Sequence, residues 1–233
     1  MANQTPKEMF KTLVTPRGAA EWAHLVEPDT KWKELGEYKT NLTVSREAAL
    51  PFIEGLLALK EQGLKFFQAD ADEEAKAKGR KGKVLNLSSQ DPWVENEDGT
   101  FTFKLKRDAK KIKEDGSVQE FKVHLLDATG REIPEADRSV YTNIGNGSII
   151  CAKVTAYPYS SPMIGVGVTL RLEKVQIINL VTYQAGGGVD TDFETVEGGY
   201  IHNAGVDSDF PSMAAQAPAQ QAASMSSEAD IVV

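Results

Sequence analysis

The feature that most constrains the fold is a short alternating stretch that follows a turn signal. Asp98-Gly99 favours a tight turn, because glycine adopts positive φ without steric cost. Apolar and polar residues then alternate strictly, in the order Phe101, Thr102, Phe103, Lys104, Leu105, Lys106. This period of two predicts a β-strand over 100–107 that buries one face and presents lysines on the other.

The basic face of this strand has two interpretations. Lysines on a flat, rigid strand can form a groove for a polyanion, and Arg107, Lys110 and Lys111 continue the basic run. Lysines also keep an ordinary solvated strand or an edge strand soluble. The alternation alone does not decide between them.

Charge is unevenly distributed along the chain. The net charge of −8 arises from 34 acidic and 26 basic residues, but segment 185–233 contains eight acids and neither lysine nor arginine. Residues 1–184 are therefore neutral overall, with bases gathered at 76–83 and 104–113. The sequence thus predicts local basic patches combined with an acidic tail.

Length and composition exclude several classes of protein. The 233 residues, 41% of them hydrophobic, are enough for one large domain or two small ones. No run of 18 apolar residues predicts a membrane span, and the N-terminus lacks the apolar stretch of a signal peptide. The single cysteine, Cys151, excludes an internal disulfide and favours a reducing compartment. We therefore expect a cytoplasmic protein without a membrane partner.

Most of the chain shows strand patterns. They predict strands over 8–15, 36–44, 100–107, 117–126, 149–157 and 165–183. Glu114-Asp115-Gly116 predicts a hairpin turn between the strands at 100–107 and 117–126. The alternation shifts phase near Lys174-Val175, which predicts a bulge or bend. Residues 19–34 have a mixed pattern that fits a strand or irregular structure.

One long helix interrupts the strands. Apolar spacing predicts a helix over about 51–78 with Pro51 in its first turn, followed by a flexible basic loop at 79–83. The strand count and order predict a mainly β protein, a five- to six-stranded OB-fold barrel with one long inserted helix. A β-sandwich is the structural alternative. We expect residues 1–202 to form this domain and residues 203–233, which are poor in large apolar groups, to be a disordered acidic tail.

The sequence offers no catalytic or metal-binding pattern. His24, His124 and His202 are far apart, and one cysteine cannot form the usual zinc sites. We therefore predict no enzyme activity, no metal and no cofactor, and favour a binding protein.

The aromatic residues suggest what is bound. Tyr157 and Tyr159 flank a proline in a polar loop after a strand that carries Lys153, which favours exposed rings. Exposed rings beside lysines are typical of proteins that stack the bases of single strands. Trp93, beside a proline, fits a stacking platform or a core anchor equally well. Core or rim positions are predicted for Trp22, Trp32 and Tyr38.

These residues carry a resemblance to a known family. The chain resembles the single-stranded DNA-binding replication proteins of tailed bacteriophages, an OB-fold family with an acidic C-terminal tail. The matching pieces occur in the family's order: Gly36-Glu-Tyr38-Lys39-Thr-Asn-Leu42-Thr43, Asn96 to Lys106, Pro158-Tyr159 with Gly165 and Val168 to Val175, and Gly186-Gly-Gly188 with Glu197-Gly-Gly199-Tyr200.

The resemblance implies a function and a set of site residues. Single-stranded DNA is expected across the barrel, with Tyr159 on a base and lysines on phosphates. The DNA-binding residues predicted from the residues and the resemblance together are Lys39, Trp93, Lys104, Lys106, Arg107, Lys110, Lys111, Lys153, Tyr157 and Tyr159. The family's basic residue before the early Gly-x-Tyr-Lys is replaced here by Leu35, whose side chain has no charge.

The tail is the second implied site. It is expected to bind replication proteins such as a polymerase or a helicase/primase, and to compete with DNA, through Glu228, Asp230, Ile231, Val232 and Val233. The family's tail is more acidic and ends in an aromatic residue, whereas this one ends in Val233. We therefore expect the tail to compete more weakly with DNA or to recognise a different partner. A homodimer is a separate expectation.

The predicted function is sequence-independent coating and protection of single-stranded DNA during phage replication or recombination in the host cytoplasm. Two alternatives stay open: a phage structural or interaction protein that binds no nucleic acid, and a small nuclease-like OB domain. The nuclease would need an acidic metal-binding cluster on strands, whereas the acidic clusters here lie at 70–74 and in the tail.

Overall fold

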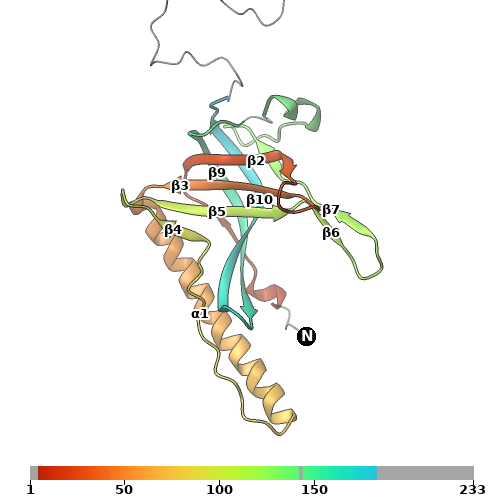
Figure 1. Cartoon of the computed structure of the whole chain (residues 1–233). Coiled ribbons are helices and arrows are strands. Elements are labelled where there is room, and N and C mark those ends of the chain that lie inside the picture. Colours follow the sequence, from red (N-terminus) through yellow and green to blue (C-terminus); the bar gives the residue numbers. More distant parts are fainter. Residues whose placement is uncertain (1–4, 142–143, 183–233) are drawn as a thin grey trace, which may run out of the picture. The chain divides into compact units, whose positions relative to one another are not determined.

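The computed structural model describes residues 5–141 and 144–182. Its centre is a ring of strands in which each pairs with the next and the last returns to the first (Figure 1). The order is β2 (Gly18–Asp29), β3 (Glu37–Val44), β5 (Phe101–Asp108), β10 (Gly165–Asn179) and β9 (Ser148–Ser161). Four pairings are antiparallel and β5–β10 is parallel. This is the OB-fold barrel, and the predicted fold class is confirmed.

Smaller elements surround the barrel. β1 (Lys11–Val14) pairs with the free edge of β9, β4 (Trp93–Glu95) pairs with β5, and β8 (His124–Leu126) runs parallel to β10. The described part of the chain also contains two 3-10 helices, η1 (Lys7–Met9) and η2 (Glu135–Tyr141).

Alternation along the barrel strands separates core from outer face. Phe103 and Leu105 of β5, Leu42 of β3, and Leu170 and Leu172 of β10 are almost completely buried. The residues between them therefore point outward, because successive side chains of a strand lie on opposite faces. This pattern fixes which polar residues can reach a ligand on the outside of the barrel.

The long helix α1 (Arg46–Ala77) lies between β3 and β4 and packs along β9 and β10. The prediction that Pro51 lies in its first turn was wrong, because the helix begins five residues earlier, after Ser45. Pro51 has no N–H to donate to the Glu47 carbonyl, and the helix continues through this gap. Gly79, at φ +61°, follows the C-terminus, where glycine tolerates the left-handed conformation.

The strand predictions were confirmed in part. The predicted phase change in β10 is a register shift against β9 between Leu172 and Lys174. The turn at Glu114–Gly116 is present, but it joins β6 (Lys110–Ile112) to β7 (Val118–Glu120) in a separate two-stranded sheet. The predicted pairing of the 117–126 strand with the 100–107 strand was therefore wrong. The β6–β7 hairpin projects from the barrel in Figure 1.

The aromatic residues predicted for the core or rim divide into two groups. Tyr38 is buried at the end of the barrel, as predicted. Trp22 and Trp32 are 68% and 84% exposed, so neither lies in the core, and of the predicted core or rim positions only the rim stays open for them. Trp32 lies in the β2–β3 loop, where the Lys31 ammonium stands 5.4 Å from its ring.

Several predictions fall outside the described residues. The proposed boundary at 202, the disordered tail at 203–233 and the tail residues Glu228 to Val233 all lie there. In the described part of the chain, no helix has the length and apolarity that crossing a membrane requires.

Candidate nucleic-acid interface

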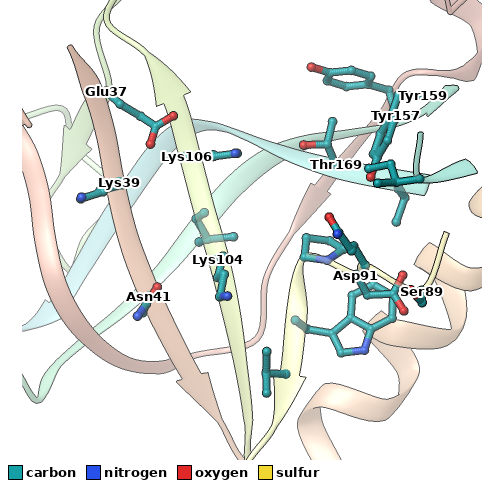
Figure 2. A pocket seen from close by; sticks show the side chains of 17 residues that line it. Glu37, Lys39, Asn41, Ser89, Asp91, Lys104, Lys106, Tyr157, Tyr159 and Thr169 are labelled. Carbon is teal, nitrogen blue, oxygen red and sulfur yellow. The ribbon is translucent and has the colours of Figure 1, made fainter. Parts of the chain in front are cut away.

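A groove of about 920 Å³ lies on the outer face of the barrel. β3 and β5 form one side, β9 and β10 form the other, and the segment 89–94 closes the helix side. Figure 2 shows Lys39, Lys104 and Lys106 on the neighbouring strands β3 and β5, across the cavity from Tyr157 and Tyr159. The structure thus brings six of the ten predicted DNA-binding residues together: Lys39, Trp93, Lys104, Lys106, Tyr157 and Tyr159.

Three cations form a row across three adjacent strands. Lys39 of β3 is the register partner of Lys106 of β5, and Lys106 is the register partner of Arg171 of β10. Directly opposite side chains have Cβ atoms about 5 Å apart, and like charges at that distance destabilise a sheet. Repulsion within this cation row, Lys39–Lys106–Arg171, therefore favours an anion over it.

Carboxylates partly neutralise the ends of the row but not its centre. Lys39 Nζ lies 2.5 Å from Asp29 Oδ2, and this hydrogen bond is the main reason that the pKa of Asp29 is lowered. Arg171 Nε donates to Glu173 Oε1 at 2.8 Å. Among residues 5–141 and 144–182, no carboxylate forms a salt bridge with Lys106 or Lys104. These two ammonium groups therefore remain available to an anion, although the carboxylates of Glu37 and Asp91 also line the groove.

Tyr159 lies flat across the neighbouring strand. Its register partner is Gly167 of β10, and a Cβ atom built on Gly167 would lie 2.5 Å from both Cζ and Oη of the Tyr159 ring. Because Gly167 has no side chain, the Tyr159 ring can rest on the backbone of β10. A ring supported on one face can offer the other face to a base with little loss of rotamer freedom.

Tyr157 is held by two neighbours, Phe10 and Arg171. Its ring centroid is 4.8 Å from that of Phe10, and the Arg171 guanidinium lies 5.7 Å from the Tyr157 centroid. Between the two tyrosines, Pro158 turns inward against α1, where a Cβ on Gly63 would lie 2.4 Å from the Pro158 Cβ. The close approach of the helix to β9 therefore sets the position of both rings.

A buried lysine supports the helix side of the groove. Lys60 of α1 is 5% exposed, and its Nζ donates to the Ser88 carbonyl at 2.6 Å and to Asp91 Oδ1 at 2.7 Å. These bonds fix the segment that leads into Trp93. Trp93 itself packs partly on the core and also lines the groove, so both sequence interpretations describe part of its environment.

The other four predicted residues lie outside the groove. The Arg107 guanidinium binds the Glu173 carboxylate and the Leu172 carbonyl and stands 5.1 Å from the Phe121 ring. Lys110 and Lys111 lie on the β6–β7 hairpin, where Lys110 pairs with Glu120 at 3.0 Å. Lys153 is exposed on β9, two residues before Thr155, and its register partner on β10 is Lys174. We leave all four out of the proposed interface.

The sequence reasoning missed Arg171 of the cation row, which lies next to the groove, and Asn41, which lines it. Arg171 stands between the inward-facing Leu170 and Leu172, and this alternation would have placed it on the outer face. Asn41, the register partner of Lys104, follows from the same rule applied to β3. Lys60 had no such signal, because a lysine in an amphipathic helix is usually solvated.

The arrangement suits the binding of a nucleic-acid strand. Ammonium and guanidinium groups attract phosphates, and supported rings accept bases. Within the described ranges, no group of three His, Cys, Asp or Glu side chains could hold a metal ion.

Known proteins are similar to this chain in both sequence and fold. The chain is 29% identical over 209 residues to the single-stranded DNA-binding protein of Enterobacteria phage T3, covering 82% of this chain and 85% of the T3 protein. It is 28% identical over 206 residues to the protein of the same description from Escherichia phage T7, with the same coverage. The crystal structure of gp2.5, a single-stranded DNA-binding protein encoded by bacteriophage T7, is similar with a TM-score of 0.61 and 26% identity, over 83% of this chain and 100% of that one.

The family assignment rests on a longer match. Residues 17–180, from the start of the barrel to the end of β10, match the family described as the single-stranded DNA-binding protein of bacteriophage T7. This match covers well over half of the chain and confirms the resemblance seen in the sequence. The chain therefore belongs to the bacteriophage T7 family of single-stranded DNA-binding proteins.

Proposed function

We propose that this protein binds single-stranded DNA in the groove without sequence preference. The observation that carries the proposal is the cation row Lys39–Lys106–Arg171 beside the supported ring of Tyr159. Phosphates over the row would relieve the repulsion between its members, and an unpaired base would stack on the free face of the ring. A duplex hides its base faces, so the same groove disfavours double-stranded DNA.

The contacts that the groove can make do not distinguish one DNA sequence from another. Every base has a π-face that can stack on tyrosine, and flexible lysines recognise phosphates that all nucleotides share. Binding should weaken steeply with salt, because phosphate contacts release counterions from the strand. The function we infer is coating and protection of the strand, not catalysis.

The biological setting is part of the proposal. The relatives are single-stranded DNA-binding proteins of phages, which supports a role in phage DNA replication or recombination in the host cytoplasm. We propose that the tail 203–233 binds replication proteins such as a polymerase or helicase/primase and competes with DNA for the groove. The support is charge: all of the net negative charge of the chain lies C-terminal to residue 184. The homodimer stays a prediction.

One titration tests the central proposal. Fluorescence anisotropy with labelled oligo-dT and a matched duplex, at low and high salt, should show tighter binding to the single strand and a marked loss with salt. Tyr159→Ala should weaken oligo-dT binding by about 1–3 kcal/mol, the free energy of one stacked base. Equal affinity for both DNAs, or no binding, would favour the alternative of a phage interaction protein.

A truncation tests the role of the tail separately. Removing residues 203–233 should leave the melting temperature of the barrel unchanged and tighten oligo-dT binding at low salt, because an acidic competitor is lost. An unchanged affinity at low salt would contradict competition without affecting the groove assignment.

A further inference from the structure

A tryptophan on the far side of the groove has an unusual backbone. Trp22 has φ +52° and is the single non-glycine residue with positive φ in the described part of the chain. A bulky residue rarely adopts this conformation, because its Cβ collides with the backbone. The Trp22 N–H donates to Asn146 Oδ1 at 3.0 Å, and this bond holds the strained turn of β2 in place.

The strain results from a β-bulge that turns the ring outward. On β2, Glu21 pairs with Asn41 and His24 pairs with Lys39, so β2 has one residue more than β3 between these pairs. Ala20 and Leu25 are buried, and Ala23 packs on the core. The exposed Trp22 ring therefore stands on the outer face of the barrel with Glu21 and His24.

Strand register places this ring at one end of a second row. Moving from β2 to β9, one level beside the cation row, this row contains Glu21 with the adjacent bulge residue Trp22, and then Asn41, Lys104, Thr169 and Tyr157. Because β5 and β10 run parallel, Thr169 and its partner Tyr157 lie on the same side of the Lys106–Arg171 pair as Lys104 and Asn41. Aromatic rings thus stand at both ends of a path that crosses five strands, about 19 Å at a strand spacing of 4.8 Å.

We propose that Trp22 is a second base-stacking subsite for single-stranded DNA, at the opposite end of the path from Tyr157 and Tyr159. The subsite fits a base rather than a phosphate, because the preceding residue, Glu21, is also on the outer face and would repel an anion. A strand that runs across the barrel would pass from the tyrosines over the cations to Trp22. This inference rests on the proposed function of the groove.

Strain makes the test unusually sharp. Glycine adopts φ +52° without penalty, so Trp22→Gly should raise the melting temperature while it removes the ring. Weaker binding by a more stable variant cannot be a folding defect. Trp22→Phe keeps a ring at the same position and serves as the matched variant, and Trp32→Ala removes an exposed tryptophan outside the second row.

The experiment measures the affinities of these variants for oligo-dT of about 4 and about 16 nucleotides, the limits of OB-fold site sizes. Trp22→Gly should weaken binding of the long oligonucleotide by about fivefold or more and leave the short one within about twofold, because the short strand is held at the tyrosine end. Trp22→Phe and Trp32→Ala should bind both lengths like the parent.

Three results would overturn the subsite. One is unchanged affinity of Trp22→Gly for the long strand while Tyr159→Ala binds weakly, which would leave the groove assignment intact. Another is an equal loss for Trp32→Ala. The third is a shift of the monomer–dimer equilibrium in sedimentation without a change in affinity, which would make Trp22 a contact between copies of the chain. If Tyr159→Ala also bound normally, the proposed function itself would fail.

Discussion

Two parts of one basic run in the sequence have different structural settings. Lys104 and Lys106 lie on β5, a strand held on both sides by the barrel, and face the groove. Lys110 and Lys111, only a few residues later, lie on an isolated two-stranded hairpin, and Lys110 pairs there with Glu120. The difference shows that a cluster of charges becomes a site only where the fold adds a second kind of contact, here the aromatic rings across the groove.

Charge reversal should separate these two parts most strongly. Lys104→Glu with Lys106→Glu should weaken oligo-dT binding by about 100-fold at low salt, because two phosphate contacts become repulsive. The slope of log affinity against log salt should also fall by about two. Anisotropy titrations over a series of salt concentrations measure both quantities.

The same charge change on the hairpin is the matched control. Lys110→Glu with Lys111→Glu should cost less than about threefold, since only long-range, screened attraction is lost. Equal losses in the two double variants would show that net charge, not the groove, determines affinity.

A smaller effect is expected from a change that adds no charge. Gly167→Ala places a Cβ atom 2.5 Å from the Tyr159 ring, so the ring must leave its support on β10. Binding should weaken by about tenfold, within the range of one lost stacking contact. The double variant Tyr159→Ala with Gly167→Ala should bind oligo-dT only slightly more weakly than Tyr159→Ala alone, because both changes remove the same stacking platform.

The control for this glycine lies on the exposed surface of the helix. A Cβ on Gly55 meets no atom within 4 Å, so Gly55→Ala should stabilise α1 by about 0.5–1 kcal/mol and leave binding unchanged. Normal binding by Gly167→Ala would mean that the Tyr159 ring is not a stacking platform.

The smallest effect on binding is expected at Glu173, which orders the neighbouring arginines. Burial raises the pKa of Glu173, but hydrogen bonds from Arg171 and Arg107 outweigh it, so the pKa is lowered. A carboxyl with a lowered folded-state pKa stabilises the fold above its unfolded-state pKa, and this stabilisation is lost as the pH falls through the folded-state value. Glu173→Gln should therefore lower the free energy of unfolding by about 1–3 kcal/mol at pH 7 and much less below pH of about 4.

Urea denaturation at several pH values measures this difference, and oligo-dT affinity should stay within about twofold. Glu120→Gln on the hairpin is the comparison, because its exposed pair with Lys110 contributes little stability. A stability difference for Glu173→Gln that persisted at acidic pH would contradict the assigned role of the ionised carboxylate.

Local patterns predicted the parts of the molecule that depend on neighbouring residues. The alternation at 101–106 placed Lys104 and Lys106 on the outer face, and the phase change near Lys174 located the bulge of β10. The glycine turn at 114–116 was also right, but the sequence does not show which strands a turn connects. That choice depends on pairing between distant segments, such as the parallel contact of β8 with β10.

The rest of the site depends on tertiary contacts that have no local signal. Trp22 is exposed because the bulge and Asn146 turn it outward, whereas composition favours burial of tryptophan. Lys60 is buried because Ser88 and Asp91, about thirty residues later, supply its hydrogen-bond acceptors. Arg107 belongs to the basic run but is engaged by Glu173, sixty-six residues away in sequence.

The seam between β5 and β10 has a consequence for the stability of the bound barrel. A single register pair, Lys106 with Arg171, joins these strands, whereas β9 and β10 pair along almost their whole length. The weakest junction of the ring is thus the point where two like charges meet. A phosphodiester bound over Lys106 and Arg171 would hold β5 and β10 together. Bound DNA would therefore suppress opening of the barrel at this junction and shift the folding equilibrium towards the folded state, by more for a tighter ligand.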